Sequence, residues 1–323
     1  MEFVKTWLIS LFAVLVLVAC GGGGGLAGGD GVATGPSLEI TEDNAAHVTS
    51  VVVESADPGT EFLVDQIDWF GSAGNQLLVN SIPGVIISLP PEDCLVDGTF
   101  TLSGVVDNEI SVTPGDSLSI GFDGCDDGLG AVLNGELEMT MGSFSPVDLN
   151  FLNPIPPYII PVTLGLTDFS VKGGGQVLIG NGDMMLELAT ENGNVVTVTM
   201  QGDSLVSEVT DIVIANTETT TLSGYLYQVT ENLVSPFNYS IEMSGKQDST
   251  AIGGSVMFET TTAFSGFESG NPEAGVLLIT GANDSQCRLT VIDLLSVKIE
   301  VDADGDGDFE TTIDGLSWDS LSS

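Results

Sequence analysis

Five carboxylates occupy alternate positions within a short stretch near the C-terminus. They are Asp302, Asp304, Asp306, Asp308 and Glu310. Hard oxygen ligands at this spacing can converge on one Ca²⁺, and Gly307 falls where a loop of the EF-hand type makes its sharp turn. We therefore expect these five side chains to hold a structural Ca²⁺, with the roughly millimolar affinity typical of extracellular modules.

The same stretch departs from a true EF-hand. Ile313 stands where an EF-hand has its bidentate Glu, and the flanking residues 297–301 and 309–313 alternate as strands do rather than as helices. An acidic hairpin turn, in which Asp and Gly serve only the backbone conformation, is the alternative. On either interpretation the loop joins two strands.

A cysteine closes a short apolar run at the N-terminus. Lys5 precedes apolar residues 7–18, which are too few to span a bilayer but have the length of a secretory signal. The run ends in Leu-Val-Ala at 17–19, directly before Cys20. This sequence resembles the lipobox of bacterial lipoproteins, which implies cleavage before Cys20 and diacylglycerol on its sulfur. An ordinary signal peptide cleaved nearby is the alternative.

The residues after the cysteine bear on location. Gly21, not Asp, follows Cys20, and by resemblance to Gram-negative lipoproteins this favours sorting to the outer membrane. We expect a lipid-anchored protein of the bacterial cell envelope that faces the periplasm or the cell surface. Residues 1–19 are then the signal peptide, and 20–37 are the lipidated cysteine and a Gly-rich tether of about 20 Å. Residues 38–323 form one β-rich domain.

Composition limits the partners. The formal net charge is −41, with 5 Lys and Arg residues against 46 Asp and Glu. So few cations cannot neutralise phosphates, which excludes nucleic acid and disfavours docking on anionic headgroups. Because 42% of the residues are hydrophobic, the chain is nevertheless expected to fold. The partners that remain are the membrane, through the lipid anchor, and an envelope protein or a hydrophobic ligand.

Three cysteines remain besides Cys20. An exported domain lies where disulfides persist, so Cys94 and Cys125, each beside a turn, are expected to pair. Cys287 is then left over. It is either a buried free thiol or a partner of one of the other two.

Two helices are expected at the start of the domain. Thr41 precedes three polar residues as an N-cap would, and the first helix should bury one face. That face consists of Ala45, Val48, Val52 and Ala56. A second amphipathic stretch presents Leu63, Ile67 and Phe70 on one side.

From about residue 76 the apolar period becomes two, which predicts antiparallel sheet with one apolar face. Examples are Leu137, Met139 and Met141, then Met184, Leu186 and Leu188, then Phe237, Tyr239, Ile241 and Met243, then Val297, Ile299 and Val301. The pairs at 134–135, 181–182 and 192–193 are all Asn-Gly, which is typical of type I′ hairpin turns. Proline-rich residues 153–157 predict a connection or edge, with a seam near 151–161.

The expected fold is therefore mainly β (α+β). One large curved antiparallel sheet, or half-barrel, of many hairpins would carry one or two N-terminal helices against its apolar face. At the level of architecture this resembles the half-barrels of periplasmic lipoprotein and lipid carriers. Residues 274–321, with Val-Asp-Ala-Asp-Gly-Asp-Gly-Asp-Phe-Glu at 301–310, resemble the C-terminal section of uncharacterised β-rich bacterial lipoproteins. That resemblance implies a fold type and no activity.

The function expected from these features is a non-enzymatic binding or structural role in the envelope. His47 is the only histidine and lies on the first expected helix, so a Ser-His-Asp or Cys-His arrangement would have to use it. A carrier of acyl chains or another hydrophobic ligand is the alternative. A hydrolase of envelope polymers that uses two carboxylates is a weaker one.

Overall fold

The computed structural model describes residues 36–56, 85–88, 90–94, 96–106, 113–126, 131–147, 149, 154–267 and 270–321. The signal peptide, Cys20, most of the tether and the second predicted helix around Leu63 lie outside the described residues.

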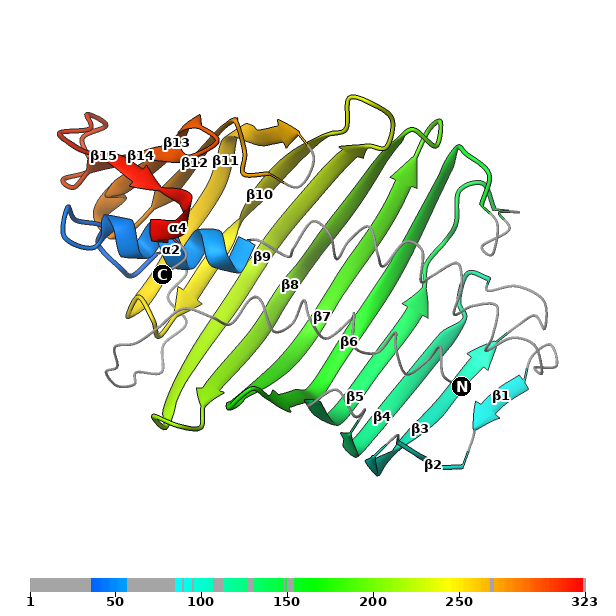
Figure 1. Ribbon diagram of the computed structural model, residues 1–323. Helices are drawn as coiled ribbons and strands as arrows, with labels where there is room; N and C mark the ends of the chain where they lie inside the picture. The colour runs from blue at the N-terminus through cyan, green and yellow to red at the C-terminus, as the bar shows by residue number, and fades with distance from the viewer. Residues whose placement is uncertain are drawn as a thin grey trace.

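One antiparallel sheet of 15 strands dominates the structure (Figure 1). Its strands are β1 (Val85–Ser88), β2 (Glu92–Asp93), β3 (Asp97–Val106), β4 (Ser117–Asp126), β5 (Ala131–Met141), β6 (Tyr158–Gly173), β7 (Gln176–Thr190), β8 (Val195–Asp211), β9 (Asn216–Asn232), β10 (Asn238–Ser249), β11 (Gly254–Phe267), β12 (Ala274–Thr280), β13 (Gln286–Asp293), β14 (Ser296–Asp302) and β15 (Thr311–Ser317). A 12-residue helix, α2 (Ala45–Ala56), a short helix, α4 (Trp318–Leu321), and a 3₁₀ turn, η1 (Ala282–Asp284), complete the described elements.

The sheet is a meander. From β3 to β15 each strand pairs with the strands before and after it in the chain, and β1 and β2 both pair with β3. Among the described strands β1 and β15 are not paired with each other, so the sheet is open. The connection that contains residues 154–157 joins β5 to β6, and these two strands pair directly. The sheet therefore continues across the predicted seam near 151–161.

Period-two alternation places one apolar face along the sheet. Leu137 and Met139 of β5 and Val297 and Ile299 of β14 are at most 7% exposed, as the pattern predicts. Phe237 is an exception: it lies in the β9–β10 connection, before β10 begins, and is 49% exposed. The mainly β fold with a large antiparallel sheet is thus confirmed.

Helix α2 packs on the C-terminal part of that apolar face. Val48 and Val52 are almost fully buried in one cluster with Cys287 and Leu289 of β13 and Ile299 of β14. The predicted position and buried side of this helix are therefore correct.

The helix is capped differently from the prediction. The side-chain Oδ1 of Asn44 accepts the Thr41 N–H at 2.8 Å, and the Thr41 carbonyl accepts the Ala45 N–H at 3.0 Å. The cap is thus made by the amide of Asn44 reaching back rather than by the Thr41 hydroxyl. No helix among the described residues is long and apolar enough to cross a membrane.

Two of the three predicted Asn-Gly turns are wrong. Asn134-Gly135 lies inside β5 and Asn181-Gly182 lies inside β7, and only Asn192-Gly193 connects two strands. Both misassigned pairs sit where the strand register shifts, that is, at bulges. A bulge uses the same left-handed glycine as a hairpin turn, which is why the dipeptide alone does not separate the two.

The bulges fall on neighbouring strands. Residues with positive φ occur in mid-strand in β4 to β7 and again in β9 and β10, namely Gly124, Gly135, Asp168, Gly182, Gly224 and Gly245. The asparagines link them, because Oδ1 of Asn134 accepts the Gly124 N–H at 2.8 Å and Oδ1 of Asn181 accepts the Asp168 N–H at 2.7 Å. Since each bulge bends its strand and increases its twist, such a row curves the whole sheet.

Candidate functional site

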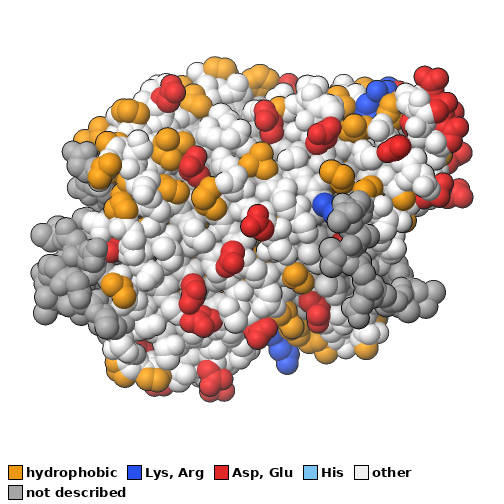
Figure 2. Space-filling model, turned by 180° about the vertical axis from the view of Figure 1, so that it is seen from behind, with side chains coloured by type: hydrophobic (Ala, Val, Ile, Leu, Met, Phe, Trp, Pro, Cys, Tyr) orange, Lys and Arg blue, Asp and Glu red, His pale blue; other side chains and the backbone are white. Residues whose placement is uncertain are grey.

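The acidic loop joins β14 to β15 at one end of the sheet. Acidic side chains gather there at the upper right of Figure 2. Asp302 is the last residue of β14 and is fully buried, whereas Asp304, Asp306 and Glu310 are exposed.

Hydrogen bonds within the loop shape it around Asp302. Oδ1 of Asp302 accepts the Gly305 N–H at 2.7 Å and Oδ2 accepts the Gly307 N–H at 2.9 Å. Both glycines have positive φ, +74° and +94°, which other residues rarely adopt. Oδ1 of Asp306 in turn accepts the Asp308 N–H at 2.8 Å. The backbone therefore winds around one buried carboxylate.

Four of the five predicted ligands converge. One carboxylate oxygen from each of Asp302, Asp304, Asp306 and Glu310 lies within 4.8 Å of the other three. If Asp302 is counted as position 1, these residues occupy positions 1, 3, 5 and 9 of a calcium loop. Asp308 is not in the cluster. It occupies position 7, where such loops use the backbone carbonyl instead of the side chain.

The loop is held against its neighbours from two sides. A Cβ on Gly305 would lie 2.4 Å from the carbonyl oxygen of Asn283 in η1, so this close approach requires glycine. On the other side the guanidinium of Arg288 lies 4.1 Å from the ring centre of Phe309, a cation–π contact. Sequence reasoning missed both supports. The only sequence signal for the contact with Asn283 was the turn-forming run Gly-Ala-Asn-Asp at 281–284.

Two of the chain's five basic residues meet one carboxylate beside the loop. Arg288 lies opposite Glu300 in the β13–β14 pair and bonds it at 2.9 Å, and Lys298 Nζ lies 3.1 Å from Glu300. Burial raises the pKa of Glu300, but the hydrogen bonds from Lys298 and Arg288 outweigh it, and the pKa lies below its usual value. The salt bridge thus fixes Arg288 in place over Phe309.

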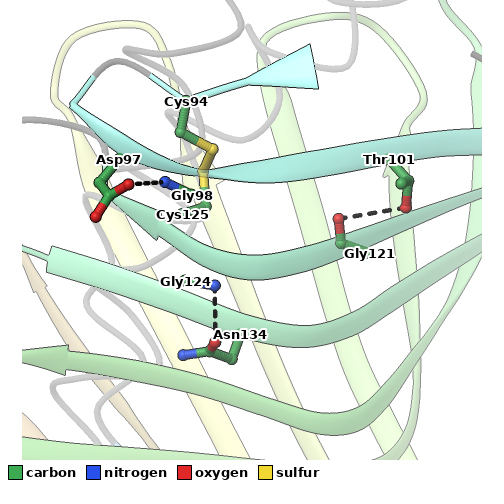
Figure 3. The surroundings of a disulfide bond; sticks show 8 residues. All are labelled: Cys94, Asp97, Gly98, Thr101, Gly121, Gly124, Cys125 and Asn134. Carbon is green, nitrogen blue, oxygen red and sulfur yellow. Dashed lines mark hydrogen bonds between the residues drawn. A yellow bond between two sulfur atoms is a disulfide. The ribbon is translucent and has the colours of Figure 1, made fainter. Parts of the chain in front are cut away.

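The predicted disulfide between Cys94 and Cys125 is confirmed (Figure 3). It joins the segment just before β3 to the end of β4, and Cys125 is 4% exposed. The neighbouring Gly98 has positive φ, and a Cβ there would lie 2.1 Å from the Gly124 carbonyl oxygen. Glycine is therefore needed where the two strands approach each other beside the bridge.

Cys287 is a free thiol. It is fully buried under α2, with its sulfur 3.5 Å from the Thr49 hydroxyl, and burial raises its pKa to about 12. His47 is engaged at the surface, where its Nε2 lies 3.2 Å from the Ala251 carbonyl oxygen. Neither side chain is arranged as a nucleophile or general base among the described residues.

A hollow of about 810 Å³ lies where the bulges of β7, β8 and β9 meet. Its lining mixes Asp183, Gln201 and Asp203 with Met184 and Met185. The Tyr225 hydroxyl closes one side and donates to the Asp183 carbonyl at 3.4 Å.

No protein-family model, no curated protein and no solved structure matches this chain. The resemblance of its C-terminal segment to β-rich lipoproteins therefore stays a prediction.

Proposed function

We propose that this protein is a lipid-anchored, acidic component of the bacterial cell envelope with a non-enzymatic binding or structural role. One observation carries the anchor: Leu-Val-Ala at 17–19 leads directly to Cys20 at the end of an apolar run of signal-peptide length. Two or more acyl chains at Cys20 would hold the domain stably on a membrane. By the same resemblance, Gly21 favours the outer membrane.

The chemistry of the described residues supports a non-enzymatic role. The only histidine of the chain lies against a backbone carbonyl, and the remaining thiol is buried and protonated. Among the described residues, the acidic loop is the one place where three or more carboxylates lie close enough together to hold a metal ion.

We propose that this loop binds Ca²⁺ as a structural ion. Four carboxylates within 4.8 Å of one another repel when ionised, and a divalent cation would replace that repulsion with coordination. The two hydrogen bonds to Asp302 hold the backbone of the loop around its carboxylate. An ion here would fasten β14 to the edge strand β15.

The anchor is tested by intact mass measurement of the protein from a Gram-negative host. The expected product begins at Cys20, carries diacylglycerol and an N-terminal acyl chain, and fractionates with membranes. A Cys20→Ala variant should lose the lipid mass and the membrane association. A soluble wild-type protein without added lipid mass would refute the anchor.

Calcium binding is tested by thermal unfolding with Ca²⁺ and with a chelator. We expect Ca²⁺ to raise the melting temperature of the wild type but not that of Asp304→Asn/Asp306→Asn. The matched control is Asp308→Asn/Asp314→Asn, which removes the same charge from exposed positions outside the cluster. Equal responses of the two double variants would show that calcium acts on the general negative charge and not at this site.

A further inference from the structure

The turn between the two longest strands is apolar. Strands β8 and β9 have 17 residues each. At the turn that joins them, Ile212, Val213 and Ile214 are 49%, 84% and 69% exposed. Turns in water usually carry Gly, Asn, Asp or Ser, so three consecutive exposed β-branched residues at a hairpin tip require an explanation.

The backbone of this tip is satisfied within the protein. Oδ1 of Asp211 accepts the N–H groups of Val213 at 2.7 Å and Ile214 at 3.1 Å. The Ile212 N–H donates to the Gly175 carbonyl in the β6–β7 turn at 2.9 Å. Unpaired backbone groups are costly to place in a medium without water, and the N–H groups of all three residues are paired here. Pairing of these N–H groups lowers the cost of moving the tip out of water.

The tether enters the domain near the same end of the sheet. Ser37 donates its N–H to the Ser255 carbonyl of β11 at 2.9 Å. Ser255 pairs with Asp248, Asp248 with Thr221 and Thr221 with Val206 in the register of the sheet. Val206 is seven residues from Val213, so the tip extends roughly 23 Å beyond the level at which the tether joins.

That distance matches the reach of the tether. The 17 steps from Cys20 to Ser37 are Gly-rich, and a chain of that composition and length has an r.m.s. end-to-end distance of roughly 21 to 25 Å. A bilayer that holds acyl chains on Cys20 is therefore within reach of the β8–β9 turn, which lies at the lower end of these strands in Figure 1.

The opposite end of the sheet is farther from the anchor. Its connections also expose apolar side chains, including Val147, Ile155, Leu233, Val234, Phe267 and Leu295, and hydrophobic side chains gather along the upper edge in Figure 2. From Ser255 to Phe267 along β11 is roughly 40 Å in the direction away from the tip. The tether favours contact at the tip over contact at this edge.

The charges near the tip indicate which lipid surface it fits. Lys172 is exposed and lies two residues before the β6–β7 turn that braces the tip, where it can meet a lipid phosphate. Glu208, Asp211 and Glu218 are close to the same turn. These carboxylates would be repelled by an anionic surface, so a zwitterionic bilayer is the fitting partner.

We propose that Ile212, Val213 and Ile214 enter the apolar boundary of the bilayer to which Cys20 is anchored. This rests on the proposed lipid anchor. It gives the domain a second membrane contact, which holds the strands upright on the surface and directs the opposite edge of the sheet away from it.

The test places a tryptophan at each end of the sheet. Lipidated Val213→Trp and Leu295→Trp proteins are reconstituted on phosphatidylcholine vesicles that contain brominated acyl chains, which quench tryptophan emission on contact. Both positions are well exposed, at 84% and 77%, so both variants should fold. The emission of the unsubstituted protein is subtracted as background. We expect the tryptophan at 213 to lose most of its emission and the one at 295 to keep it.

Flotation of the same vesicles separates the two proposals. Protein that floats but shows no quenching at 213, or equal quenching at 213 and 295, overturns the tip contact and leaves the anchor intact. Protein that does not float refutes the anchor and, with it, this arrangement of the domain.

Discussion

Removing the link between Cys94 and Cys125 is expected to lower the free energy of unfolding by about 3.7 kcal/mol. The two cysteines are 31 residues apart, and in the chain-entropy model closing a loop of that length removes about 12 cal/mol/K from the unfolded chain. The perturbation is reduction of the wild-type protein, which leaves both sulfur atoms in place. A Cys94→Ala/Cys125→Ala variant should lose somewhat more, because Cys125 also packs in a buried cluster with Phe122 and Leu133.

The assay is urea unfolding followed by circular dichroism, with and without reductant. A Cys287→Ala variant is the control and should respond to reductant as the wild type does, because Cys287 takes no part in the bridge. After reduction, the backbone amides of β3 and β4, next to the bridge, should be the first to lose protection from hydrogen exchange, while those of β8 and β9 stay protected. Identical midpoints and slopes for oxidised and reduced protein would refute the reasoning.

Two further outcomes are expected. Gly182→Ala should destabilise by more than about 2 kcal/mol, because its φ is +130° and the new Cβ would lie 2.4 Å from the Ser204 carbonyl oxygen. Gly174→Ala, which has positive φ but open space, should cost only about 1 kcal/mol, and similar urea midpoints for the two would contradict the role of the bulge. For Cys287, burial raises the folded-state pKa to about 12 from an ordinary 9.0, so its contribution to stability is present below pH 9 and is lost as the pH rises toward 12. Cys287→Ala should flatten the fall of unfolding free energy above pH 9, and an unchanged alkaline slope would contradict the assignment.

Much of the fold was predictable because burial on one face of a sheet imposes a period of two. Met139 and Ile299 follow that rule, and the acidic loop falls between two strands for the same reason. The pairing of Cys94 with Cys125 was predictable because an exported domain lies where disulfides persist and because each cysteine lies beside a turn.

The remainder depends on contacts between segments that one sequence does not reveal. Asn181-Gly182 has the composition of a hairpin turn, and only the neighbouring strand, with its Asp168 amide, makes it a bulge. Within the acidic loop, spacing identified the carboxylates but could not show that Asp308 lies outside the cluster that the other four form. The support comes from Asn283 in η1 and Arg288 in β13, which lie outside the loop in the sequence, so the loop itself carried little signal for it.

The meander has a consequence for how the sheet comes apart. Because each strand from β4 onward is bonded only to its neighbours in the chain, unfolding can begin at either edge and proceed strand by strand, as in repeat proteins. Both edges are reinforced. The disulfide ties the segment before β3 to β4, and at the other edge the Ser50 hydroxyl of α2 donates to the Leu321 carbonyl of α4. Contacts that stabilise the two edge regions of the sheet protect every strand between them from unfolding. The long central strands can therefore accept bulges and glycines that a sheet of this length with unprotected edges would not tolerate.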